Sequence, residues 1–126
     1  MSFLKMFRNW ENISEIDAGA IIFRENEPAD QFFVILSGEV QLTLRGEALT
    51  TEGEGGVIGE MTMIESAGNS TTATALSDVR LACLDREQLH SIIEDDSEFS
   101  LHVMEVLANR LRSVDQYIAT HIDPKD

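Results

Sequence analysis

Between about residue 15 and residue 85, hydrophobic and polar positions follow the short period of β-strands. Apolar residues alternate with Gln and Thr in VQLTL (40–44), which is typical of a strand with one buried face. Turn-forming residues interrupt the apolar runs, as in NEPAD (26–30). The glycine turns SGE (37–39) and RGE (45–47) predict a meander of hairpins. Seven or eight short strands in such a stretch predict a β-sandwich, jelly roll or barrel.

The first residues of the chain follow a helical spacing instead. Phe3, Leu4, Phe7 and Trp10 would share one face of a short helix over about 2–11. We expect this face to pack on the β-rich body, because apolar stripes usually face a core. A surface for a partner protein is the alternative interpretation.

Two helices are predicted after the β-rich segment, over about 86–122. Asp85 and Gln88 have the spacing of a capping box at the start of the first helix. The second helix is expected to begin near Ser97, and Pro124 would end it. Its apolar positions recur at intervals of three and four residues, which favours either packing on the β body or a homodimer contact. These positions are Met104, Leu107, Leu111, Val114 and Ile118.

Composition narrows the range of partners. The chain has 126 residues, 43% of them hydrophobic, which fits a single domain spanning 1–126. Its formal net charge is −14, so it would repel nucleic acid and anionic lipid, and we expect neither as a partner. No apolar run approaches a membrane span, and the first residues lack a secretory cleavage signal. With a single cysteine, Cys83, which we expect to be buried, these features favour a cytoplasmic protein.

The residues that carry most enzyme chemistry are scattered. His90, His102 and His121 all fall in the predicted C-terminal helices, and we expect them at the surface. No Cys-His or Ser-His-Asp arrangement can be argued, no phosphate loop of the Walker type is present, and no metal-ligand cluster is expected. The sequence therefore indicates a binding or regulatory protein rather than an enzyme.

Three segments resemble the cyclic-nucleotide-binding domains of the bacterial catabolite activator and of protein kinase A regulatory subunits. They are DAGAIIFRENEPADQFFVILSGEVQL (17–42), GGVIGEMTMIE (55–65) and ALSDVRLACLDREQLHSII (75–93). The resemblance implies a mainly β fold. This fold is an eight-stranded β-roll of the jelly-roll kind, flanked by a short N-terminal helix and two C-terminal helices. A cyclic nucleotide, cAMP or cGMP, would be the regulatory ligand.

The resemblance also assigns roles within the phosphate-binding cassette, which opens at Gly59, Glu60 and Met61. The family's Gly-Glu pair begins a short helix whose N–H groups face the cyclic phosphate, and the Glu binds the ribose 2′-hydroxyl. A helix N-terminus suits an anion, and glycine lets the ligand approach the backbone. Ser70 and Thr71 stand where the family has small or hydroxyl residues.

The chain departs from the family at the phosphate anchor. Asn69 stands where the family has an Arg, and a shift of one residue would place Ser70 there instead. Neither supplies a cation, because no Lys or Arg lies between Arg45 and Arg80. A charge-assisted hydrogen bond contributes about 1.5–3 kcal/mol, so its loss would weaken binding about ten- to a hundredfold.

We therefore predict a stand-alone regulatory module, without a DNA-binding domain, that binds cAMP or cGMP weakly or not at all. The alternative is a protein-interaction module of the same fold with a different ligand or none. Its protein partner is unknown from the sequence.

Overall fold

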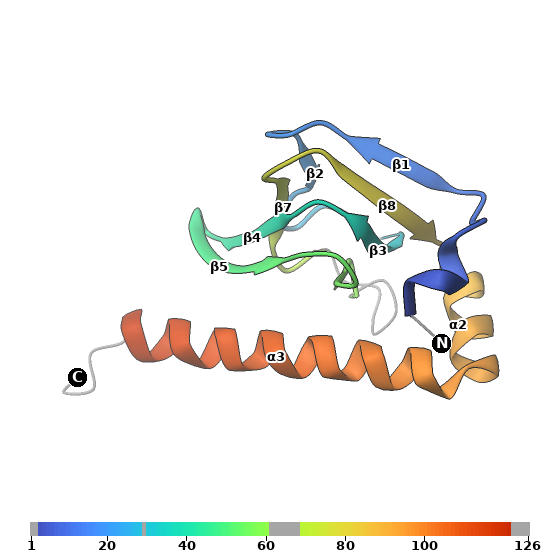
Figure 1. Cartoon of the computed structure of the whole chain (residues 1–126). Helices are drawn as coiled ribbons and strands as arrows, with labels where there is room; N and C mark the ends of the chain where they lie inside the picture. Colours follow the sequence, from blue (N-terminus) through green and yellow to red (C-terminus); the bar gives the residue numbers. More distant parts are fainter. Residues whose placement is uncertain (1–2, 29, 61–68, 122–126) are drawn as a thin grey trace.

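A computed structural model describes residues 3–28, 30–60 and 69–121 of the chain. The described strands form two antiparallel sheets of four strands each, in the orders β1-β8-β3-β6 and β2-β7-β4-β5 (Figure 1). The elements are η1 (Phe3–Phe7), β1 (Ile13–Ile16), β2 (Ile21–Phe23), β3 (Phe32–Ser37), β4 (Val40–Leu44), β5 (Glu47–Glu52), β6 (Val57–Ile58), β7 (Thr72–Ala75), β8 (Val79–Leu84), α2 (Arg86–Asp95) and α3 (Ser97–His121). The predicted β-roll with flanking helices is therefore confirmed.

One core lies between the two sheets. Ile35 and Leu81 point inward from the first sheet and meet Leu42 and Ala73 of the second, and all four are buried. Cys83 is buried in the same core, as expected. Alternate residues of β3 and β8 face the opposite side, because side chains alternate along a strand. The first sheet therefore has two apolar faces, and only one of them is covered by the other sheet.

The helices cover part of the outer face of the first sheet. Phe32 and Leu84 of that face pack in one cluster with Phe7 from η1, Leu89 from α2 and Phe99 from α3. The rings of Phe7 and Phe99 lie 6.2 Å apart between centroids. This packing, with Leu4 and Trp10 against the same cluster, confirms that these three apolar N-terminal residues face the body. The side chain of Phe3 lies outside the described residues.

The N-terminal helix is shorter than predicted. It is a five-residue 3₁₀ helix rather than a helix over about 2–11. The indole Nε1 of Trp10 donates to the carbonyl oxygen of Cys83 at 2.9 Å, which ties the segment after η1 to β8. This contact between distant residues and the entry into β1 at Ile13 replace the further helical turn that the spacing predicted.

The predicted meander of hairpins is correct at one turn and wrong at the other. Arg45 and Gly46 both have positive φ and join β4 to β5 as a hairpin. By contrast, β3 and β4 belong to different sheets, so the SGE turn is a corner between layers. Gly38 has φ +89°, and a Cβ there would overlap the carbonyl oxygen of Asp78. The spacing of turns along the chain cannot distinguish a corner from a hairpin.

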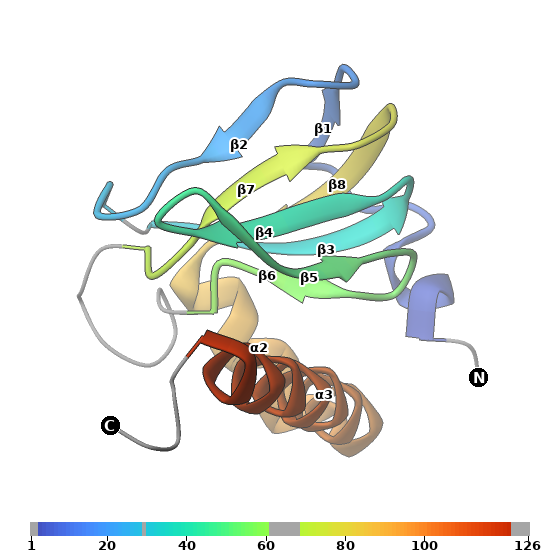
Figure 2. The same cartoon turned by 90° about the vertical axis from the view of Figure 1, so that its left-hand side faces the viewer.

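The C-terminal helices begin where the sequence predicted. Asp85 caps α2 by accepting from the Gln88 amide at 2.8 Å, and the Gln88 side chain accepts from the Asp85 amide. The second helix, α3, begins at Ser97 and runs along the outside of the roll (Figures 1 and 2). No helix in the described ranges combines the length and the apolar character needed to cross a membrane.

Candidate functional site

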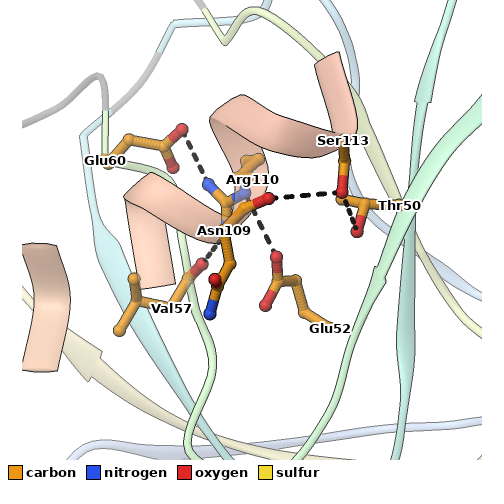
Figure 3. A network of polar contacts seen from close by, with 7 residues as sticks. All are labelled: Thr50, Glu52, Val57, Glu60, Asn109, Arg110 and Ser113. Carbon is orange, nitrogen blue, oxygen red and sulfur yellow. Dashed lines mark hydrogen bonds and ion pairs between the residues drawn. The ribbon is translucent and has the colours of Figure 1, made fainter. Parts of the chain in front are cut away.

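Arg110 of α3 connects three points of the roll. Its Nε donates to Oε2 of Glu52 at 3.3 Å, and its Nη2 donates to the carbonyl oxygen of Val57 (Figure 3). Its Nη1 lies 2.8 Å from Oε1 of Glu60 in an ion pair that lacks the alignment of a hydrogen bond. Glu52 ends β5, Val57 begins β6, and Glu60 follows β6. We call these residues the Arg110 cluster.

The Arg110 cluster is largely removed from water. The side chain of Arg110 is 9% exposed, and those of Glu52 and Glu60 are 13% and 17% exposed. Burial raises the pKa of the Glu52 carboxyl above its usual value of 4.5, and nearby Glu60 adds to the rise, while Arg110 opposes it. One guanidinium therefore faces two half-buried carboxylates, and it is the cation that compensates both of them.

A hollow of about 350 Å³ opens beside this cluster, between the roll and α3. The polar residues that line it are Glu60, Ser70, Thr71 and Arg110. The apolar lining comes from Leu49 of β5 and from Leu107, Leu111 and Val114 of α3. The volume suits a small organic ligand, since such sites span roughly 300–1,000 Å³. Arg110 is the one cation among the described residues that line it.

Gly59 positions Glu60 at the edge of this hollow. It has φ +79°, and a Cβ built there would lie 2.6 Å from the carbonyl oxygen of Gln31. Any larger residue would therefore strain the backbone and displace β3. The predicted site residue Met61 lies outside the described residues, as does the rest of 61–68.

Asn69 is buried and only 5% exposed. Its amide and its Nδ2 both donate to the carbonyl oxygen of Glu27, at 2.9 and 3.3 Å, and its own carbonyl oxygen accepts from the amide of Asn26 at 2.8 Å. It lines a separate hollow of about 200 Å³ together with Phe23 and Phe33. The structure thus brings Glu60, Ser70 and Thr71 to one hollow and places Asn69 at another.

Sequence reasoning missed Arg110. The sequence around the cassette holds no Lys or Arg between Arg45 and Arg80, whereas the guanidinium beside Glu60 comes from α3. The helical spacing of Arg110 between Leu107 and Val114, both predicted to be on a packing face, was the signal that could have found it.

His102 is also not the surface group that was expected. It is half-buried, and its Nε2 lies 2.7 Å from the carbonyl oxygen of Gly55. A carbonyl can only accept, so Nε2 carries the proton in this contact. Within the described ranges, no group of three or more His, Cys, Asp or Glu side chains could hold a metal ion.

Comparison with known proteins identifies the family. Residues 13–96 match the cyclic nucleotide-binding domain, so the chain belongs to that family. It is 33% identical over 106 residues to a CRP-like cAMP-activated global transcriptional regulator of Mycobacterium tuberculosis, a match that covers 80% of this chain and 47% of that protein. The chain therefore spans about half the length of this relative.

Two solved structures support the same fold. The c-di-GMP responsive global regulator CLP of Xanthomonas campestris superposes with a TM-score of 0.82 at 20% identity, covering 96% of this chain and 65% of that one. The cAMP-bound form of the EAL enzyme Bd1971 matches with a TM-score of 0.61 at 33% identity, covering 86% of this chain and 31% of that one. The matched fold is that of a regulatory, cyclic-nucleotide-binding sensor domain, and the family makes cAMP or cGMP a possible ligand.

Proposed function

We propose that this chain is a regulatory module that binds a cyclic nucleotide weakly in the hollow between the roll and α3. The observation that carries this proposal is the convergence of Glu60, Ser70, Thr71 and Arg110 on one hollow. A carboxylate can accept from sugar hydroxyls, and hydroxyls and a guanidinium can donate to a phosphate. The names of two matched proteins, each 33% identical, mention cAMP, which supports the same class of ligand.

The weakness of binding follows from how Arg110 is used. The guanidinium already contacts Glu52, Glu60 and the Val57 carbonyl, so a phosphate must compete with two carboxylates for it. A second cation to balance the phosphate is missing from the described lining of the hollow. An anion that enters therefore meets one guanidinium that two carboxylates already outnumber, and the gain in electrostatic free energy is small.

The same contacts would connect ligand binding to α3. A sugar hydroxyl that binds Glu60 competes with the Arg110 ion pair, and Arg110 is part of α3. A ligand that binds better to one arrangement of this pair shifts the position of α3 in proportion to that preference. We propose that α3 is the output element of the module.

Calorimetric titration of cAMP and cGMP into nucleotide-free protein tests the proposal. We expect weak binding by the wild type, and about ten- to a hundredfold tighter binding by Ser70→Arg, because position 70 lines the hollow and is exposed. Asn69→Arg is the matched control, since position 69 lines the other hollow. The proposal is contradicted if neither the wild type nor Ser70→Arg binds either nucleotide. If only Asn69→Arg gains affinity, the phosphate position assigned here is wrong.

A second candidate function is protein interaction through α3, and the exposed face of the helix favours it. Leu101, Met104, Ala108, Leu111 and Ile118 are exposed and recur at intervals of three, four, three and seven residues. Leu107 and Val114, which the sequence placed on the same seam, are half-buried toward the roll. The exposed seam is thus rotated from the predicted one, and its heptad spacing suits a second copy of the chain.

The mass of the protein in solution, from sedimentation or light scattering, tests this second candidate. Asp115 occupies one position of the exposed seam, where it would face an acidic partner copy. We expect Asp115→Leu to strengthen a dimer and Met104→Glu to weaken it, because one removes a charge from the seam and the other adds one. A monomer in both wild type and Asp115→Leu would exclude this dimer.

A further inference from the structure

A groove of about 450 Å³ lies beside the N-terminal segment, away from the Arg110 cluster. One wall is formed by η1 and the residues after it, which contribute Lys5, Arg8 and Trp10. The outer face of the first sheet contributes Leu36 of β3 and Arg80 of β8. We call this feature the N-terminal groove.

The groove exists because the helices cover only part of the outer face of the first sheet. Val34 and Ala82 of that face are fully buried beneath the helical layer. Leu36 lies two residues after Val34 in β3, and Arg80 lies two residues before Ala82 in the antiparallel strand β8. Leu36 is half-buried and Arg80 is exposed. Since alternate residues share a face, the apolar surface continues past the helices and ends at Arg80. Trp10 is half-buried at the border of this surface, and its indole is held by the bond to the Cys83 carbonyl.

The charge of the groove is opposite to that of the chain. Lys5, Arg8 and Arg80 are three of the nine basic residues, and Glu54 is the one acidic residue of the described lining. The whole chain carries a formal net charge of −14. Arg80 is only loosely held, because Glu15 lies 3.7 Å away and both side chains are mostly exposed. Cations are thus concentrated next to an apolar floor in an otherwise acidic protein.

We propose that the N-terminal groove binds a short acidic segment of a partner protein that carries a bulky apolar side chain among its acidic residues. The apolar side chain would lie on Leu36 and Trp10, and carboxylates on either side would face Lys5, Arg8 and Arg80. This site shares no lining residue with the hollow of the proposed function, and it does not depend on a nucleotide.

The exposure of the three cations selects a peptide over a small anion. An ion pair at an exposed position contributes about 0.2–1 kcal/mol, so one small anion would be held too weakly. A peptide with several carboxylates adds these contributions to the burial of its apolar side chain. A nucleic acid or a membrane would extend well beyond the screening length of about 8–10 Å onto acidic surface and be repelled. A short segment remains within the cationic groove.

Fluorescence of Trp10, the one tryptophan of the chain, provides a direct test. The probe is a short synthetic peptide that alternates Glu with Leu and lacks aromatic residues. We expect a saturable change in Trp10 emission that weakens as salt is added. Lys5→Glu combined with Arg8→Glu should reduce the affinity at least about tenfold. Arg24→Glu, which changes another exposed cation by the same charge, should leave the affinity within about twofold.

Several results would overturn the proposal. A peptide with Gln in place of Glu that binds equally well would show that the charges do not contribute. Succinate or inorganic phosphate producing the same change at similar concentration would make this a small-anion site. An equal loss of peptide affinity in Arg24→Glu would show that only the net charge of the protein matters. Binding of anionic vesicles in preference to the peptide would indicate a membrane-binding surface. If the double variant is unstable, Arg80→Gln gives the same test from β8. Circular dichroism of each variant shows whether the fold is intact.

Discussion

The Arg110 cluster and the N-terminal groove use the same kind of residue in opposite ways. Arg110 is buried and contacts two carboxylates and a carbonyl of the roll, so its charge is compensated within the fold. Lys5, Arg8 and Arg80 are exposed, and their charge remains accessible to another molecule. The difference arises from where the helices cover the roll. The packing of α3 on the roll buries Arg110 between them, whereas η1 ends before the outer face of the first sheet does. Burial thus decides how much of a cation's charge remains accessible to another molecule.

The largest expected effect that separates the two regions is on stability. Arg110→Met should lower the free energy of unfolding by about 3 kcal/mol, because it leaves the half-buried Glu52 and Glu60 without their cation. Arg8→Met is the matched control and should change it by less than about 0.5 kcal/mol, since Arg8 is exposed. Urea unfolding followed by circular dichroism measures both. Similar losses in the two variants would mean that the Arg110 cluster does not stabilise the fold.

A smaller effect is expected when one carboxylate of the cluster is neutralised. Glu60→Gln keeps the shape of the side chain but replaces a charged partner of Arg110 with a neutral one. The expected loss is about 1 kcal/mol, because the variant loses a partly exposed ion pair while Glu52 still compensates the guanidinium. The same urea experiment measures it, with Glu39→Gln, at an exposed position, as the control. A stability equal to that of the wild type would indicate that Glu60 is not held by Arg110 in solution.

The Glu52 carboxyl should make stability depend on pH. Burial raises its pKa in the folded state above the usual 4.5, which also describes the unfolded chain. Between these two values the folded state binds more protons, so this contribution to stability falls as pH rises and levels off above the folded pKa. Glu52→Gln removes the contribution, so the stability of the variant relative to wild type should increase with pH across this window. Unfolding curves of wild type, Glu52→Gln and the control Glu39→Gln at a series of pH values measure this effect. If the stability of Glu52→Gln changes with pH in the same way as that of the wild type, this assignment is wrong.

The smallest effect is expected at the edge of the N-terminal groove. Glu15→Gln removes the loose ion pair with Arg80 and should change stability by less than about 0.5 kcal/mol. It should also raise the affinity for the Glu-Leu peptide by no more than about fivefold, because it removes a competing carboxylate. Trp10 fluorescence measures the second effect. A drop in affinity would place the peptide away from Arg80.

The local elements were largely predictable because their signals are local. The alternation in VQLTL, the capping box at Asp85 and the glycine hairpin at Gly46 each depend on residues close in sequence, and each is found in the structure. The corner at Gly38 was not predictable in the same way. A turn sequence predicts that the chain reverses direction. Which of the two sheets the next strand joins depends on the packing of residues far apart in sequence.

The candidate site shows the same limit. The sequence identified Glu60, Ser70 and Thr71 as cassette residues, and they line one hollow, whereas Asn69 lies at another. It did not identify Arg110, because a cation can approach the cassette from any element that folds over it. Whether these residues bind a nucleotide is the question that the Ser70→Arg titration answers.

The sequence by itself determined the strands, the helix starts, the family and the acidic character of the chain, because these depend on periodicity, capping, motif and composition. Only the tertiary structure decided which of the described cations are buried and which are exposed. The packing of α3 and η1 on the roll sets the exposure of each charged group, and exposure sets the strength and the use of its interactions.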